Sequence, residues 1–107
     1  MEENMQQKAG CPNVHTTRRG RLEKTLMRSN LTDEILLRAL AVLDSQRPKL
    51  KPSVQMFRLF HGLDGVALMQ SEVIAAQLGV TKIRVRSGVA DTQIRLHNPY
   101  VWEQSAL

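Results

Sequence analysis

Two kinds of side chain are scarce in this sequence. It has one cysteine, Cys11, and its aromatic residues are two Phe, one Tyr and one Trp among 107 residues. A single cysteine cannot form a disulfide within the chain, which favours a reducing compartment, so we expect a cytoplasmic protein. No apolar run approaches the roughly 18 residues that a membrane span requires, and the polar amino-terminal residues lack the apolar stretch of a signal peptide. The core must therefore consist mainly of Leu, Val, Ile, Met and Ala.

Signatures of catalysis and of metal binding are also missing. The sequence has no glycine-rich phosphate loop and no nucleophile elbow, and its ten acidic residues are scattered. Cys11 and His15 have a spacing seen in metal sites, but no second pair completes a site, and His61 and His97 stand alone. We therefore expect no enzymatic activity, no metal and no cofactor.

Positive charge is what the sequence does contain. The formal net charge is +5, from 15 Lys and Arg residues against 10 Asp and Glu residues. This balance favours nucleic acid as a partner, because basic side chains that neutralise phosphates release counterions. A solvated basic surface without a polyanion partner is the alternative. A chain of this length forms one small domain with little spare stability, so homodimer formation would help it.

The chain divides by composition into a tail and a domain. Residues 1–28 indicate a weakly ordered basic tail, and residues 29–107 a single domain. The tail carries a basic cluster formed by Arg18, Arg19 and Arg21. Such a run usually stays solvated or makes dimer contacts, although it could also touch phosphates or the minor groove as an arm.

A first helix is predicted near the start of the domain. Residues 29–34 combine capping side chains with acids, which is typical of a helix start. Leu36, Leu40 and Leu43 follow at helical spacing and form an apolar stripe. Since proline disfavours a continuing helix, we expect the helix to end near residues 45–47, before Pro48.

A basic connector and a second helix should follow. The two prolines of residues 47–52 exclude a continuous helix there, so the second helix is expected to begin at Pro52 or Ser53 and to end at Gly62. Between Ser45 and His61 the sequence has four basic residues and no acid. This stretch could approach a phosphate backbone or could simply be exposed.

Residues 70–89 match the pattern of a helix-turn-helix unit. The pattern needs aliphatic and small residues in a first helix, a glycine for the tight turn, an aliphatic residue, a cap, and a core residue in the second helix. These roles are filled in chain order by Ile74, Ala75, Leu78, Gly79, Val80, Thr81 and Val85. The run resembles the helix-turn-helix superfamily of bacterial regulators, including its winged-helix members. That resemblance implies a second helix that enters the DNA major groove.

Three positions depart from that pattern. Gly88 stands where the second helix usually carries an aliphatic core residue, Ile83 stands where an exposed polar residue is common, and Gln70 is a poor cap, although Ser71 could serve. The second helix is therefore expected to be short and to end at Ser87–Gly88.

An alternating pattern supports a rival structure for the same region. Polar and apolar residues alternate in residues 82–86 and 93–97, as in two strands of a basic β-hairpin. A winged-helix layout combines both ideas, with a helix at 81–87 and a wing strand at 93–97. The fold class we predict is mainly α: a small helical domain with a helix-turn-helix, and with a C-terminal β-hairpin or wing left open. Tyr100 and Trp102 would share one face of an extended segment and fix the chain end to the core or to a partner subunit.

Two functions from different classes follow from these patterns. The first is a sequence-specific DNA-binding transcriptional regulator, a homodimer that reads DNA through residues 81–87. Its expected DNA contacts are polar and basic side chains of the unit and beyond: Gln77, Thr81, Lys82, Arg84, Arg86, Ser87 and Arg95. The second is a non-enzymatic adaptor or inhibitor that binds a protein partner through the Leu-rich helix and the C-terminal aromatics. Binding to DNA across a salt series separates the two.

Overall fold

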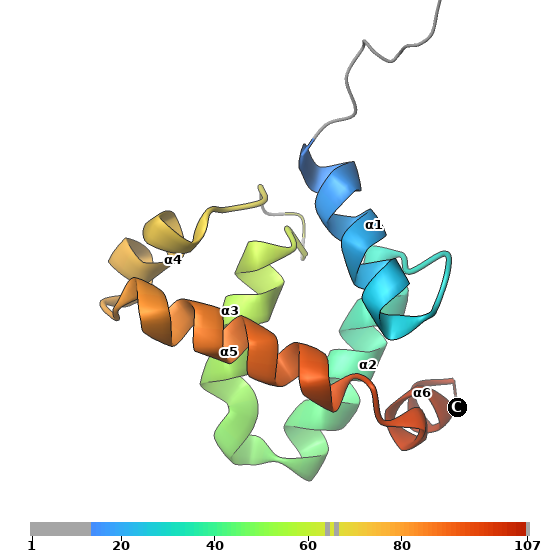
Figure 1. The fold of residues 1–107 in the computed structure, drawn as a ribbon. Helices are drawn as coiled ribbons and strands as arrows, with labels where there is room; N and C mark the ends of the chain where they lie inside the picture. The colour runs from blue at the N-terminus through green and yellow to red at the C-terminus, as the bar shows by residue number, and fades with distance from the viewer. Residues whose placement is uncertain (1–13, 64, 66, 107) are drawn as a thin grey trace, which may run out of the picture. The chain divides into compact units, whose positions relative to one another are not determined.

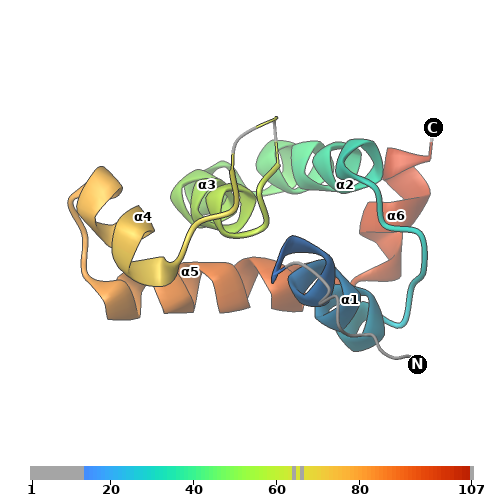
Figure 2. The ribbon, with the colours of Figure 1, turned by 90° about the horizontal axis from the view of Figure 1, so that it is seen from above.

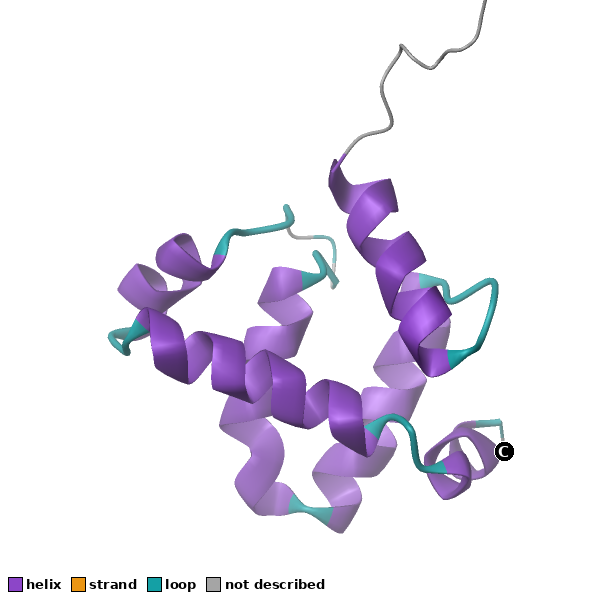
Figure 3. Cartoon of the chain, viewed as in Figure 1, coloured by secondary structure: helices purple, strands orange, loops and turns teal. Residues whose placement is uncertain are grey.

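The structure is a computed structural model that describes residues 14–63, 65 and 67–106. This part of the chain forms six α-helices and a short 3-10 helix, with no strand (Figure 3). The mainly helical fold class predicted from the sequence is thus confirmed. The chain divides into two compact units, Met1–Asn30 and Leu31–Leu107.

The first unit contains helix α1, Val14–Leu26. The sequence indicated a weakly ordered tail here, but the described residues form more than three helical turns. Leu22 and Leu26 are both buried, and their spacing of four puts them on one side of the helix. Arg18, Arg19 and Arg21 therefore lie on a helix rather than on an extended arm. Cys11 lies outside the described residues.

The second unit opens with α2, Asp33–Gln46, close to its predicted position. The Thr32 hydroxyl accepts a hydrogen bond from the Ile35 amide at 3.2 Å, and Asp33 and Glu34 occupy the first turn. Both features stabilise a helix start. The predicted leucine stripe is buried along this helix, together with Ala39.

A proline-initiated turn links α2 directly to the next helix. The 3-10 helix Pro48–Leu50 leads without a break into α3, Lys51–Phe60. Gly62 ends the segment with a φ of 63°, in the left-handed region that glycine adopts at low cost. The expected connector and second helix are thus present, with the helix starting one residue before Pro52.

Helices α4, Ser71–Leu78, and α5, Lys82–Arg95, follow one another across a tight turn. Gly79 ends α4 with φ 69° and ψ 35°, and the Thr81 hydroxyl caps α5 by accepting from the Arg84 amide at 3.0 Å. Both roles were predicted. Gln70 precedes α4 without a side-chain cap.

The predicted hairpin, wing and short second helix are wrong, because α5 continues to Arg95. The alternation of polar and apolar residues does not decide the structure here. The buried positions of α5 and its C-terminal cap follow helical spacing instead: Val85, Gly88, Val89, Thr92 and Leu96. The Thr92 hydroxyl donates to the Gly88 carbonyl at 3.0 Å, one turn back in the same helix.

Gly88 marks the place where α5 crosses α3. Figures 1 and 2, viewed from perpendicular directions, both show α5 lying against α3. A Cβ atom at Gly88 would lie 2.6 Å from Met56 Sδ and 3.3 Å from Ser53 Cα. A side chain here would have to displace the end of Met56 and would crowd the Ser53 backbone, so glycine at this position allows the two helices to approach closely.

Helix α6, Pro99–Ser105, closes the second unit and packs against α2. Trp102 is buried, and its indole Nε1 donates to the Leu96 carbonyl at 2.6 Å. The expected extended segment is therefore wrong: Asn98 caps a helix, and residues two apart on a helix point in nearly opposite directions. Trp102 holds the helix in place, whereas Tyr100 is 49% exposed.

Candidate nucleic-acid interface

The side chains of α5 fall on four sides of the helix. With about 100° per residue, the buried side holds the positions that face the core. One flank carries Arg84, Asp91 and Arg95, and the opposite flank carries Lys82, Arg86 and Gln93. The outer side, away from the core, carries Ile83, Ser87, Ala90 and Ile94, all of which are exposed. The basic residues predicted as one site therefore divide between two flanks.

A hollow of about 390 Å³ separates the first flank from the connector between α2 and α3. We call it the basic hollow. Four cationic side chains and one carboxylate contribute to its wall, which is formed by Arg47, Lys49, Leu50, Ser53, Arg84, Ser87, Asp91 and Arg95. Its positive charge comes from three segments: the end of α2, the 3-10 helix and α5.

Arg84 lies across the crossing of α3 and α5. Its two terminal nitrogens lie 3.5 and 3.4 Å from Ser53 Oγ, and one of them lies 3.7 Å from Met56 Sδ. These distances are at the long limit of hydrogen bonding. The guanidinium therefore lies over α3 in weak contacts and retains capacity to donate to an anion.

Asp91 supplies the negative charge in the basic hollow. Its Oδ1 lies 3.6 Å from Arg95 Nε, one helical turn further along α5, and both side chains are partly exposed. A partly exposed pair at this distance is weak. Asp91 therefore offsets part of the positive charge of the hollow but contributes little to holding Arg95.

The opposite flank is tied to α4 by an ion pair. Lys82 Nζ lies 3.1 Å from Glu72 Oε2. The pKa of Glu72 is lowered by a hydrogen bond from its own backbone amide and by the hydrogen bond and charge of Lys82, with a smaller effect of Arg86. Arg86 is exposed on the same flank. The ion pair fixes Lys82 beside the turn.

The other predicted DNA contacts, Gln77, Thr81 and Ser87, lie in different surroundings. Gln77 is exposed on α4, and Ser87 is exposed on α5 at the edge of the basic hollow. The Thr81 hydroxyl is engaged as the cap of α5. The structure thus brings Arg84, Ser87 and Arg95 together, and it sets Lys82 and Arg86 apart from them.

Sequence reasoning missed that Arg47 and Lys49 face α5. The stretch was marked as basic and able to approach phosphates, but nothing local in it shows which helix it faces. Gly88 was the available signal. A glycine at an expected core position indicates a close helix crossing, and that crossing brings the connector beside α5.

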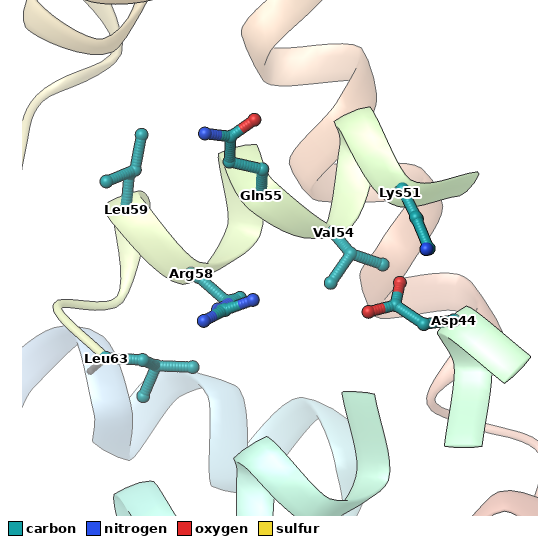
Figure 4. A pocket seen from close by; sticks show the side chains of 7 residues that line it. All are labelled: Asp44, Lys51, Val54, Gln55, Arg58, Leu59 and Leu63. Atoms are coloured by element: carbon teal, nitrogen blue, oxygen red, sulfur yellow. The ribbon is translucent and has the colours of Figure 1, made fainter. Parts of the chain in front are cut away.

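A second hollow, of about 430 Å³, lies between α2 and α3. Figure 4 shows Lys51 and Arg58 of α3 and Asp44 of α2 on its wall, with Val54, Leu59 and Leu63 beside them. Its wall is more apolar than that of the basic hollow and has fewer cations. It is thus a poorer match for a polyanion.

Comparison of the chain with protein-family models, with curated proteins and with solved structures finds no match. Among residues 14–63, 65 and 67–106, no helix combines the length and apolarity needed to cross a membrane. The same residues include no group of three His, Cys, Asp or Glu side chains that could hold a metal ion.

Proposed function

We propose that this chain is a DNA-binding transcriptional regulator that docks α5 on duplex DNA. The observation that supports it is the exposed, capped α5 after a left-handed glycine turn, with cationic side chains on both of its flanks. A major groove about 12 Å wide admits one helix, and phosphate backbones then border that helix on both sides. Cations on two flanks match this arrangement.

The side chains of α5 have different roles in this proposal. The outer side faces the base edges, where Ile83 and Ala90 can contact thymine methyl groups and the Ser87 hydroxyl can bond to bases. Arg86 reaches a guanine or the adjacent phosphate from one flank. Arg84 is assigned to a phosphate rather than a base, because its guanidinium is directed toward Ser53. The regulator acts as a homodimer that reads two half-sites.

Selection of bound fragments from random duplex DNA tests whether the chain binds DNA in a sequence-specific way. The expected result is a palindromic motif, bound with an affinity that falls steeply as salt rises. Arg86→Gln should relax the preference at one base position or lower affinity, while the control Arg38→Gln on α2 should do neither. If the intact chain fails to bind mixed duplexes at low salt, DNA binding is excluded.

A second candidate function is favoured by the apolar outer side of α5. Ile83 is 79% exposed and Ile94 is 66% exposed, and Ala90 lies between them on the same side. Such a stripe is also suited to packing against a helix of a protein partner. The leucine stripe of α2 and Trp102, which the sequence suggested for an adaptor, are buried, so an adaptor would use this stripe together with the exposed Tyr100.

Substitution on the stripe separates the two candidates. Ile94→Lys adds positive charge to the outer side of α5, so it should preserve or strengthen binding to mixed DNA. The same change should abolish a protein contact made through Ile83 and Ile94. Sedimentation and DNA binding measured on one preparation give both readouts. The adaptor is favoured if the unaltered chain associates with a protein but does not bind DNA, and if Ile94→Lys abolishes that association.

A further inference from the structure

The basic hollow gathers more positive charge than its own wall neutralises. Arg47, Lys49, Arg84 and Arg95 line it from three segments, and Asp91 is the one acid among its lining residues. Like charges held close together repel, and an anion between them removes that repulsion. The composition of the wall therefore indicates an anionic ligand.

The donors on the wall match the oxygens of a phosphate. Guanidinium groups form charge-assisted hydrogen bonds with phosphate, and a lysine ammonium binds it as a point charge. Arg84 has only long bonds, of 3.4 and 3.5 Å, to Ser53. The Ser87 hydroxyl is exposed at the same wall. These groups can turn toward a phosphate without breaking a strong contact.

The hollow is suited to the phosphate alone and not to a nucleobase. No aromatic side chain is among its lining residues, so it offers no stacking surface. Leu50 and Ser53, which are buried, form part of its wall and belong to backbone fixed by the 3-10 helix and the crossing at Gly88. The floor of the hollow is thus preformed, so binding needs to order only the cationic side chains around it.

We propose that the basic hollow binds one phosphodiester group of a DNA backbone, an inference that rests on the proposed function. The hollow lies on one flank of α5, beside the outer side assigned to base edges, which is where a bordering strand passes a helix in the major groove. Arg47 and Lys49 then contact the phosphate from the connector, and Arg84 and Arg95 contact it from α5. The phosphate fixes the orientation of the helix in the groove and carries no sequence information.

Salt dependence of binding tests this contact. Each phosphate contact contributes about 0.9 to the slope of log K against log salt for duplex DNA. Because they share one phosphate, Arg47→Gln and Lys49→Gln should each flatten that slope by a part of about 0.9, and each should weaken binding equally for all sequences. Arg38→Gln removes the same charge from the exposed ion pair of α2 and should leave the slope unchanged. Thermal unfolding of all three variants verifies that they remain folded.

Titration with small phosphates identifies the source of the group. Dimethyl phosphate, as a diester, should shift the amide resonances of the non-proline residues in 47–53 and of residues 84–95, and the shifts should vanish in Arg47→Gln. If DNA binds but the salt slopes of Arg47→Gln and Lys49→Gln both equal that of the unaltered chain, the phosphate site is overturned and the proposed function stands. If DNA does not bind, the proposed function fails. Inorganic phosphate shifting the same amides would then assign the hollow to a free phosphate, and the absence of shifts would overturn it.

Discussion

The carboxyl end of α4 and the middle of α5 each require a glycine, but for different physical reasons. Gly79 has a left-handed φ of 69°, and a Cβ atom there would meet nothing within 4 Å. Gly88 is an ordinary helical residue, but a Cβ atom there would meet Met56 at 2.6 Å. The first requirement belongs to the backbone and the second to packing. Substitutions at the two sites should therefore destabilise the fold by different amounts. At Gly79 the loss should depend on how readily the new residue adopts a positive φ, and at Gly88 on the size of its side chain.

The largest effect is expected at the helix crossing. Gly88→Val forces branched carbons against Ser53 and Met56, and overpacking of this kind typically costs 1–3 kcal/mol of the free energy of unfolding. The end of Met56 can move away, but the Ser53 backbone at 3.3 Å has less freedom to do so, so we expect a loss of about 2–3 kcal/mol. Chemical denaturation followed by circular dichroism measures it.

Gly20→Val is the matched control for that change. Gly20 also lies in a helix, and a Cβ atom there would meet nothing within 4 Å. Since valine has a higher helix propensity than glycine, the control should be neutral or slightly stabilising. Equal denaturation midpoints for the two valine variants would show that the crossing tolerates a side chain.

Gly88→Val should also lower DNA affinity, because it displaces Arg84 from Ser53.

The glycine turn should show a smaller effect that depends on backbone conformation. Gly79→Ala places an L-residue in the left-handed region, which costs about 1–2 kcal/mol. Gly79→Asn should cost less, because asparagine adopts this region more readily. Denaturation of the two variants gives the comparison. If alanine and asparagine were equally destabilising, steric contact rather than φ would explain the requirement for glycine.

The cap that follows the turn should contribute about as much as an average helix cap. Thr81→Ala removes the hydroxyl that accepts from the Arg84 amide, with an expected loss of about 1 kcal/mol. Thr81→Ser retains the hydroxyl and should restore most of that stability. Faster hydrogen exchange at the first amides of α5 in the alanine variant would locate the effect. No difference between the alanine and serine variants would contradict a capping role.

The contrast between the two glycines also explains how far the sequence could predict the structure. Thr32, Pro48, Gly79 and Thr81 act within a few residues of the chain, so their local signals predicted α2, the connector and the turn before α5. The length of α5 depends on tertiary packing, because Val89, Thr92 and Leu96 are buried and α5 lies against α3. The local alternation of residues 93–97 suggested a strand instead, and tertiary packing overrides such a preference.

The candidate site was predicted only in part for the same reason. Arg84, Ser87 and Arg95 were named from their position after the turn. Their neighbours Arg47 and Lys49 are more than thirty residues earlier in the chain, and only the crossing of α3 and α5 brings them beside α5. The two flanks could be separated only after residues 82–95 were known to be helical, because a strand would have aligned Lys82, Arg84 and Arg86.

The smallest effect on stability is expected at the surface ion pair between Glu72 of α4 and Lys82 of α5. The lowered pKa of Glu72 means that its contribution to stability is present above the pKa of the unfolded chain and is lost as the pH falls through the folded value. Lys82→Met should raise the pKa of Glu72 toward its usual range. Part of the lowering should remain, because the hydrogen bond from the backbone amide of Glu72 is its largest cause. Carboxyl resonances followed across pH measure this change, with Lys51→Met as a control of equal charge. An unchanged Glu72 pKa in Lys82→Met would mean that Lys82 is free in solution and available to a phosphate on that flank.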